Sequence, residues 1–482
     1  MVNAASTGEF RYREVAGRVK AMIESGTLST GDRLPSLRGL ARSMGVSIST
    51  VSQAYLELER QGLIQARPRS GFFVCPARRM QAPARRAATP PQARPVNRSQ
   101  LINTVLDSLG RRDLLPLGVI CPSPELLPGK ALTRLMAQAL REAADDPAQE
   151  DPMDYGTIQG LPGLRRSIAF RAMERNEAVS PDDTLITCGA MEALYIALRC
   201  LTRPGDAVCI QSPTYYCFLQ LLETLGLRAI EIPSHPDSGI HPRDVREVLD
   251  TFDIHACVFC PNFNNPDGSL TPDGAKAEIT AMLAGRHIPL VEDDVYGDLH
   301  FGPHRPGTCK RHDAQGLVIL CSSFSKTLAP GWRVGWMTPG RFMAKAMEIK
   351  ATTNVCTATP TQMAVGRFLR QGLYERHLVR LRAAVARQAE TMRHHVARGF
   401  PEGTRATTPA GGSVLWLELP GVDAVDYFFA ARDMGIGIAP GPVFSTLDKY
   451  NHFVRLSCGG VWNEAMEQGI AALGRLAGEM AQ

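Results

Sequence analysis

The chain has 482 residues, of which 44% are hydrophobic and 21% charged, and its formal net charge is +5. This length is too great for one small domain and predicts two or three, with a composition ordinary for globular proteins. No run of 18 apolar residues and no basic-then-apolar N-terminal stretch occurs, so we expect no membrane span, no signal peptide and a cytoplasmic location.

The first predicted unit, residues 9–75, is a small helical domain that ends in a hairpin. Apolar residues recur at helical spacing in its first part, and a second, shorter helix follows. Ser47 is suited to be the N-cap of a third helix, predicted over residues 48–61. Two short strands complete the unit, at 63–65 and 71–74.

Polar and basic residues of this unit are suited to bind double-stranded DNA. A short helix can enter the major groove with its N-terminal end, where hydroxyl groups donate to phosphates and base edges. Arginines in the preceding helix and in the turn of the hairpin can reach bases or the phosphate backbone. The candidate DNA-binding residues are Arg38, Ser47, Ser49, Thr50, Arg67 and Arg69.

The same unit resembles the winged helix-turn-helix domain of the GntR family. The matching pieces are Gly31-Asp32-Arg33-Leu34-Pro35-Ser36-Leu37-Arg38, Leu40-Ala41, Gly45-Val46-Ser47, Ser49-Thr50-Val51, Ala54-Tyr55, Leu58-Glu59, Gly62-Leu63-Ile64 and Gly71-Phe72-Phe73-Val74. The resemblance implies an operator with repeated half-sites. Ile48 departs from the family, in which arginine is common here, so a guanine contact is lost and contact with a thymine methyl group can replace it. A helical domain that binds no nucleic acid is the alternative.

Residues 76–100 form a predicted linker, rich in Pro, Ala and Arg and without hydrophobic periodicity. No acidic residue lies between Glu59 and Asp107, which suits a polyanion partner, although a solvated basic linker explains the same composition. Such a segment cannot bury enough apolar surface to order itself. We therefore expect a flexible linker that lets the flanking domains lie far apart or exchange between subunits.

Strand-like and helical runs alternate through the third segment, residues 101–482. The predicted strands are 184–188, 207–211, 228–232, 256–259, 288–291 and 317–321, followed by 413–418 and 453–457. This order predicts an α/β domain with a mostly parallel sheet covered by helices, followed by a smaller α/β lobe. Cys257 and Cys260 form a CxxC pair in an apolar strand-like run, where they face opposite sides; this favours buried cysteines over a redox or metal site.

Lys326 carries the clearest chemical signal in this segment. It lies in Cys321-Ser322-Ser323-Phe324-Ser325-Lys326-Thr327-Leu328-Ala329-Pro330-Gly331-Trp332-Arg333, with a serine three residues before it and an arginine seven after. This stretch resembles the cofactor-lysine segment of fold-type I enzymes that depend on pyridoxal 5′-phosphate (PLP), and the chain from about Leu117 resembles their aminotransferases. The resemblance implies that Lys326 forms an aldimine with PLP and that Ser323 and Arg333 hold its phosphate.

Further pieces of the aminotransferase pattern occur in the family's order. Gly189-Ala190-Met191 follows a strand and opens a helix, whose N-terminus would cradle the phosphate. Asp293 follows another strand and would pair with the protonated pyridine nitrogen, which keeps the ring an electron sink. The neighbouring Asp294 makes this assignment ambiguous, and the spacing to Tyr296 favours Asp293.

The resemblance also implies roles for residues around the ring and its ligand. Tyr215 would stack on the pyridine, and Asn265 and Tyr296 would bond its 3-oxygen. Tyr155 resembles the tyrosine that reaches the phosphate in a neighbouring subunit. Arg455, with Asn265, would bind the substrate, because Arg455 resembles the arginine that clamps a carboxylate with two hydrogen bonds. The implied catalytic residues are Lys326, Asp293 and Tyr296.

A GntR-type winged helix, a linker and an aminotransferase-like domain form the architecture of the MocR subfamily of regulators, which the chain resembles over almost its whole length. The resemblance implies a homodimer, in which the heads can be exchanged between subunits. It also implies a DNA-binding regulator that senses an amino acid, an amine or PLP itself. An active PLP-dependent aminotransferase with an accessory DNA-binding domain is the alternative, because nothing in the site residues forbids turnover.

Overall fold

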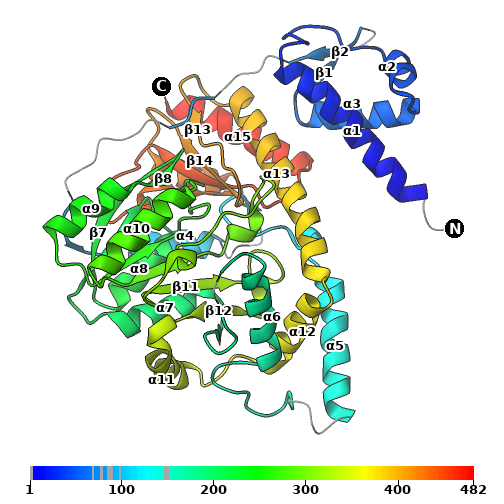
Figure 1. The fold of residues 1–482 in the computed structure, drawn as a ribbon. Helices are drawn as coiled ribbons and strands as arrows, with labels where there is room; N and C mark the ends of the chain where they lie inside the picture. Colours follow the sequence, from blue (N-terminus) through cyan, green and yellow to red (C-terminus); the bar gives the residue numbers. More distant parts are fainter. Residues whose placement is uncertain are drawn as a thin grey trace.

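The computed structural model of the protein shows a small N-terminal head and a large domain (Figure 1). The described residues are 4–67, 70–75, 80–83, 91–96, 99–109, 111, 113–145, 151–177 and 179–481. The head, drawn in blue in Figure 1, lies at one end of the long helix α13 (Leu373–Gly399). Within these residues, we find no helix with both the length and the apolar character needed to cross a membrane.

The head combines a helical layer with a two-stranded hairpin. Its elements are α1 (Ala4–Glu24), α2 (Leu37–Met44), α3 (Ile48–Arg60), β1 (Ile64–Arg67) and β2 (Gly71–Val74). Tyr55 is buried at its centre, where the hydroxyl donates to Pro35 O at 2.8 Å and the ring lies edge-on to Phe72. Ser47 accepts a hydrogen bond from the backbone N–H of Thr50, so the predicted third helix and its N-cap are confirmed.

Two parts of the predicted linker contact the large domain. Gln81 O accepts a hydrogen bond from Ala406 N at 3.0 Å. Strand β3 (Arg94–Pro95) pairs antiparallel with β7 (Arg228–His235). The expectation that the composition of residues 76–100 prevents any order was therefore wrong for these two parts. The physical reason is that an edge strand offers unpaired backbone groups, which bind an extended segment whatever its side chains.

The large domain is built on a sheet in which β7, β6, β9, β10 and β11 are parallel neighbours. Its strand order is β3-β7-β6-β9-β10-β11-β12-β5, and β8 pairs with β7 outside this path. The bounds are β5 (Leu185–Thr187), β6 (Ala207–Ser212), β8 (Gly239–Ile240), β9 (Ala256–Phe259), β10 (Leu290–Asp293), β11 (Val318–Ser323) and β12 (Gly335–Thr338). The predicted, mostly parallel sheet is confirmed. Strand β12, antiparallel between β11 and β5, was not predicted.

Helices cover both faces of this sheet (Figure 1). They are α4 (Ser99–Leu109), α5 (Gly129–Asp145), α6 (Pro162–Met173), α7 (Ala190–Leu201), α8 (Tyr216–Thr224), α9 (Pro242–Thr251), α10 (Asp273–Gly285), α11 (Met343–Thr353) and α12 (Thr359–Arg370). Neighbouring residues of β9 show the alternation of faces: Val258 packs in the core with α7, and Cys257 packs in the core with α9 and α10. Both faces of the parallel strands are therefore buried.

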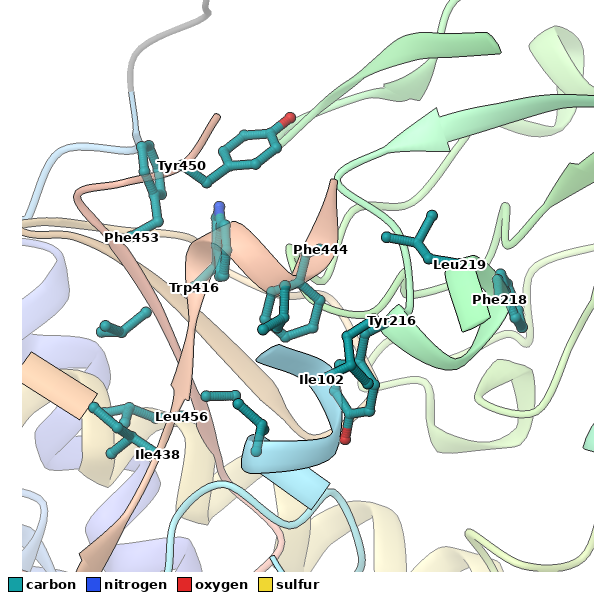
Figure 2. Close-up of a cluster of buried hydrophobic side chains, with 14 of the residues drawn as sticks. Ile102, Tyr216, Phe218, Leu219, Trp416, Ile438, Phe444, Tyr450, Phe453 and Leu456 are labelled. Atoms are coloured by element: carbon teal, nitrogen blue, oxygen red, sulfur yellow. The ribbon is translucent and has the colours of Figure 1, made fainter. Parts of the chain in front are cut away.

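The smaller lobe is a second sheet with helices packed against it. Its elements are β13 (Arg405–Ala406), β14 (Val414–Glu418), β16 (Ala439–Pro440), β17 (Phe453–Ser457), α14 (Ala424–Asp433) and α15 (Glu464–Met480), and β15 (Ile436–Gly437) pairs with β4 (Leu115–Pro116). Phe444 joins the lobe to the large sheet. Its ring centre lies 5.4 Å from that of Trp416 of β14 and 5.5 Å from that of Tyr216 of α8. Figure 2 shows these three side chains in one buried cluster.

Candidate cofactor site and DNA-reading face

A cavity of about 180 Å³ opens at the carboxyl ends of the parallel strands, the usual ligand position in an open α/β sheet. Residues from β10, from the loop after β11 and from the first turn of α7 meet there. The predicted site residues that line it are Ala190, Met191, Tyr215, Asn265, Asp293, Tyr296, Ser323, Lys326 and Arg333. Segments more than 100 residues apart in the chain are thus brought into one site.

Lys326 projects its amine into this cavity. Nζ donates to the backbone oxygen of Ile120 at 2.7 Å and lies 6.0 Å from the ring centre of Tyr296. Burial lowers the pKa of this amine, and Arg455 lowers it further, against the opposing influence of Cys121 and Asp293. A lowered pKa increases the fraction of neutral amine, which is the form that attacks a carbonyl carbon.

The three consecutive acids at the end of β10 have different partners. Glu292 accepts hydrogen bonds from the backbone N–H groups of Cys309 and Lys310. Asp294 accepts from Asn262 at 2.8 Å and forms an ion pair with Arg305. Asp293 is the acid that lines the cavity, and its buried Oδ1 has no hydrogen-bond partner among the described residues. Burial and the charge of Asp294 raise the pKa of Asp293 to about 7.

A cradle suited to an anion lies at the start of α7. Gly189 precedes the helix with φ of +81°, and a Cβ atom there would lie 2.4 Å from Nη2 of Arg333. Arg333 donates to the oxygen of Cys188 at 3.0 Å and to Oγ of Ser325 at 3.3 Å. Helix N–H groups, a guanidinium and serine hydroxyls therefore line the same cavity, and together they form a donor set suited to a phosphate group.

Arg455 is buried in β17, directly beyond the cavity. Its Nη1 donates to Oδ1 of Asn265 at 3.0 Å, its Nη2 donates to the oxygen of Gly118, and its Nε has no partner among the described residues. The Phe444 ring centre lies 5.1 Å from this guanidinium. The predicted pair of substrate-binding residues, Asn265 and Arg455, is in direct contact.

Tyr155 does not join this site within one chain. It is 82% exposed and lies in the segment before α6, next to Met153, which is 91% exposed. The cavity is lined without it. A role at the phosphate of a neighbouring subunit stays a prediction.

The candidate DNA-binding residues of the head are mostly exposed. Arg38 and Ser49 are exposed on α2 and α3. Ser47 caps α3 and also contacts the hydroxyls of Ser49 and Thr50 at 2.8 Å, so it organises the others. Arg67 lies over the ring of Phe73 at 4.4 Å. Arg69, the remaining candidate, lies outside the described residues.

Comparison with known proteins places this geometry in a family. Residues 11–74 match the family model "Bacterial regulatory proteins, gntR family", and residues 127–473 match "Aminotransferase class I and II". The uncharacterized HTH-type transcriptional regulator YjiR of Escherichia coli is 36% identical over 96% of this chain and 98% of its own. The chain belongs to the MocR subfamily of GntR-type transcriptional regulators. The HTH-type transcriptional regulator TauR of Rhodobacter capsulatus is 29% identical over 95% of each chain.

The large domain of this MocR-type regulator has the fold-type I aminotransferase fold. The α-aminoadipate aminotransferase LysN of Thermus thermophilus, solved with N-(5′-phosphopyridoxyl)-L-leucine, superposes with a TM-score of 0.71 at 29% identity, over 79% of this chain and 94% of LysN. The family's cofactor is PLP. The residues present fit it: an amine in the cavity, a buried carboxyl oxygen of Asp293 that has no hydrogen-bond partner among the described residues, and a phosphate cradle. Among the described residues, no cluster of metal-binding side chains occurs.

Several contacts of this MocR-type site were missed by sequence reasoning. Ser325 and Asn264 line the cavity, and Ser325 could have been found because it stands between Ser323 and Lys326. The backbone oxygens of Gly118 and Ile120 bind Arg455 and Lys326. No side-chain pattern marks a backbone acceptor, so these two contacts carried no signal in the sequence.

Proposed function

We propose that this protein is a DNA-binding transcription regulator that holds PLP covalently on Lys326 and responds to an amino acid, an amine or PLP itself. The observation that carries the proposal is that one chain combines an exposed GntR-type reading helix with a complete set of PLP-binding groups around Lys326. PLP, when bound, supplies an electrophilic carbon for amines and a ring that withdraws electrons.

Different residues of the chain bind different parts of the cofactor. The N-terminus of α7, Ser323 and Arg333 bind the phosphate, and Tyr215 supports one ring face. Asp293 holds a proton at the ring nitrogen, because a buried carboxylate favours the positive charge there. The amide of Asn265 uses Oδ1 for Arg455, which directs its N–H groups to the cavity and the ring oxygen. Tyr296 offers a second hydroxyl donor on that side.

Arg455 and Lys326 select and receive the effector. A buried guanidinium beside Asn265 binds a carboxylate through two hydrogen bonds, which favours α-amino acids over simple amines. Lys326 would hold the cofactor, and its lowered pKa would let it accept or release a proton at Nζ when an amine enters the cavity. Regulation follows if the site with the effector bound and the site without it favour different arrangements of the DNA-binding heads.

A homodimer is part of the proposal. Met153 and Tyr155 are 91% and 82% exposed, although one is apolar and the other aromatic, and they neighbour each other before α6. A second copy that covers this segment would bury both and bring Tyr155 to the partner's phosphate cradle. Sedimentation at micromolar concentration tests whether the protein is a dimer. Tyr155→Phe should weaken the retention of PLP but leave the dimer intact.

DNA binding with and without cofactor tests the regulator directly. A labelled duplex from upstream of the protein's own gene is titrated at fixed salt, because basic proteins bind any DNA at low salt. We expect competitor-resistant binding that changes with PLP, and an amino-compound response that Lys326→Ala abolishes. The proposal would be overturned if the DNA affinity of the Lys326→Ala variant still changed normally with both PLP and the amine.

An active aminotransferase is the second candidate function. It is favoured by one observation: Lys326, Asp293 and Arg455 are all in place around the same cavity. This activity would be established if an amino donor and a keto-acid acceptor gave more than one molecule of product per site. We expect half-reactions without sustained turnover.

A further inference from the structure

We propose that Tyr374 is a positioning residue, whose hydroxyl ties the loop that carries Lys326 to the segment of residues 293–298. That segment carries Asp293 and Tyr296, which line the cavity. Tyr374 is the second residue of α13, is buried and does not line the cavity, so it acts through its neighbours. This role rests on the proposed function for its consequence at the cofactor, whereas the restraint on Lys326 does not.

The hydroxyl of Tyr374 contacts the residue that directly follows Lys326. It lies 2.8 Å from Oγ1 of Thr327, and both side chains are buried. His377, in the same turn of α13, holds the backbone of that residue. Its Nε2 donates to the oxygen of Thr327 at 2.7 Å, since a carbonyl oxygen only accepts. The start of α13 therefore fixes the residue next to Lys326 by both its side chain and its backbone.

The same hydroxyl also contacts Asp298, the last residue of the segment. Oη of Tyr374 donates to Oδ2 of Asp298 at 2.9 Å. A carboxylate only accepts, so the single hydroxyl proton of Tyr374 is used here and its oxygen accepts from Thr327. One hydroxyl thus lies between the two parts of the chain, and each of its two hydrogen bonds has a fixed direction.

Asp298 is a firmly held partner because guanidinium groups surround its carboxylate. Arg175 and Arg305 donate to Oδ1 at 2.7 and 2.9 Å. Arg171 donates to Oδ2 at 3.3 Å. Burial opposes the ionised form, but the charges of these arginines outweigh it and hold the pKa of Asp298 well below its usual range. The carboxylate therefore stays ionised at neutral pH and keeps the hydrogen bond of Tyr374.

Asp298 cannot move far without the residues that we assign to the cofactor ring. It lies two residues after Tyr296 and five after Asp293. Arg305 also pairs with Asp294, beside Asp293, so one guanidinium connects both ends of this short segment. The contact through the tyrosine hydroxyl therefore sets the distance between the lysine loop and these two cofactor residues.

The restraint matters because the amine of Lys326 is held in a buried place. Nζ donates to the oxygen of Ile120 at 2.7 Å, and burial is the main cause of its lowered pKa. A loop that moved freely would let water reach the amine, and hydration raises the pKa of a buried amine toward its ordinary value. Less of the amine would then be neutral at neutral pH, which makes it a poorer nucleophile.

A merely structural role for Tyr374 is the alternative, and a matched pair of variants separates the two. The Tyr374 ring lies edge-on to Phe324 at 5.7 Å and under the guanidinium of Arg171 at 4.2 Å. Tyr374→Phe keeps the ring and removes only the hydroxyl. The control is Tyr427→Phe in the smaller lobe, where a buried hydroxyl donates to the oxygen of Leu473 at 2.7 Å. Both variants lose a buried hydroxyl, but only the first loses a link to the lysine loop.

Labelling of Lys326 in the full chain without cofactor tests the restraint. Acetic anhydride acetylates neutral amines, so the yield at Lys326 against pH, measured by mass spectrometry, gives a midpoint for this amine. We expect the midpoint to rise by about 0.5 pH unit or more in Tyr374→Phe. Tyr427→Phe should leave it within about 0.2 pH unit of the wild type. Equal midpoints in Tyr374→Phe and the wild type would overturn the inference.

The partner residue provides a second, independent pair of variants. Thr327→Val removes the same hydrogen bond from the other side, so the inference can be decided even if Tyr374→Phe does not fold. We expect Thr327→Val to raise the midpoint as Tyr374→Phe does, and Thr327→Ser, which keeps the hydroxyl, to restore the wild-type value. A midpoint that is equally raised in Thr327→Ser would show that the hydroxyl is not responsible.

The charged and titratable groups near Lys326 are unchanged in all of these variants. They are Asp293, Tyr296, Arg455, Cys121 and Cys217. No substitution adds or removes a charge near the amine, so a shift of the midpoint reports a change in the position or hydration of Lys326.

Capture of PLP, followed by its absorbance, separates this inference from the proposed function. A midpoint raised by about 0.5 to 1 pH unit lowers the neutral fraction of the amine, and hence the rate of capture at neutral pH, by about 3- to 10-fold. If Lys326→Ala captures PLP with the same absorbance change as the wild type, the proposed attachment fails, while the labelling midpoints still decide the restraint. If the wild type uses Lys326 and Tyr374→Phe captures PLP equally fast with an unchanged midpoint, the positioning role is wrong and the proposed function stands.

Discussion

Arg455 of the smaller lobe donates a hydrogen bond of 3.0 Å to Oδ1 of Asn265, in the turn after β9 of the large sheet. The two lobes therefore meet through the pair of side chains that we assign to the effector's carboxylate and to the cofactor ring. A carboxylate that binds Arg455 must share or displace this bond, which connects effector binding to the contact between the lobes. This relationship motivates the first prediction.

Arg455→Lys should weaken the response to amino acids without affecting PLP. Lysine keeps the charge but cannot form the two parallel hydrogen bonds of a guanidinium. We expect an affinity loss of about 10- to 100-fold for α-amino acids, or roughly 1.4–3 kcal/mol. Spectral titration of the cofactor measures it. Amines that lack a carboxylate serve as the control, and an equal loss for them would show that Arg455 only supports the fold.

Asp293→Asn should change how the stability of the cofactor-free protein depends on pH. The folded pKa of about 7 exceeds the unfolded value, so the folded state holds the extra proton between about pH 4 and 7. Its free energy of unfolding therefore falls as pH rises through this window, by about 4 kcal/mol at most from this group. The variant does not lose this free energy of unfolding. Its melting temperature should therefore exceed that of the wild type at pH 8 but not at pH 4.

Asp294→Asn is the matched control for that measurement. It removes a buried acid one residue away, but this acid pairs with Arg305 and does not face the cavity. The substitution removes one of the three acids paired with the buried Arg305 and leaves Asp298 and Glu177 in place, so this variant should melt lower than the wild type at pH 8. If Asp293→Asn also melts lower there, its carboxyl is stabilising and our account of its environment is wrong.

The candidate cofactor residues could be named from the sequence because each lies in a short linear pattern that resembles the aminotransferase family. Lys326, with serines before it and an arginine after, is marked by local spacing, and Asp293 follows a strand that periodicity reveals. The ambiguity between Asp293 and Asp294 needed the fold, since only the structure shows Arg305 reaching Asp294. The mostly parallel character of the sheet followed from the alternation of its strands with helices, whereas the order of the strands needed the structure.

Contacts made by the backbone or between domains could not be predicted. The oxygen of Ile120 binds Lys326 from a position 206 residues away, and any residue type supplies the same oxygen. The pairing of β3 with β7 also uses the backbone, so a composition typical of a flexible linker concealed it. The close approach of His394 to Gly62 depends on how two domains meet, which no pattern within either domain encodes.

Ser47→Ala and Ser49→Ala should separate the stability of the head from its DNA contacts. Ser47 accepts the hydrogen bond of the Thr50 N–H and so caps α3, whereas Ser49 is exposed and makes no such bond to the backbone in the described residues. We expect Ser47→Ala to lower the unfolding free energy of the head by about 1 kcal/mol, and Ser49→Ala to lower it by less than about 0.5 kcal/mol. Thermal unfolding followed by circular dichroism measures both, and Ser47→Asp, which can also cap, is the control.

DNA affinity should order these variants differently. Ser47→Asp keeps the cap but places a negative charge near the phosphates, so it should bind DNA more weakly than Ser47→Ala despite its greater stability. Ser49→Ala should lose affinity without losing stability, because only a DNA contact is removed. Anisotropy titrations at one salt concentration compare the three. Unchanged affinity in both Ser49→Ala and Ser47→Asp would show that this end of α3 does not contact DNA.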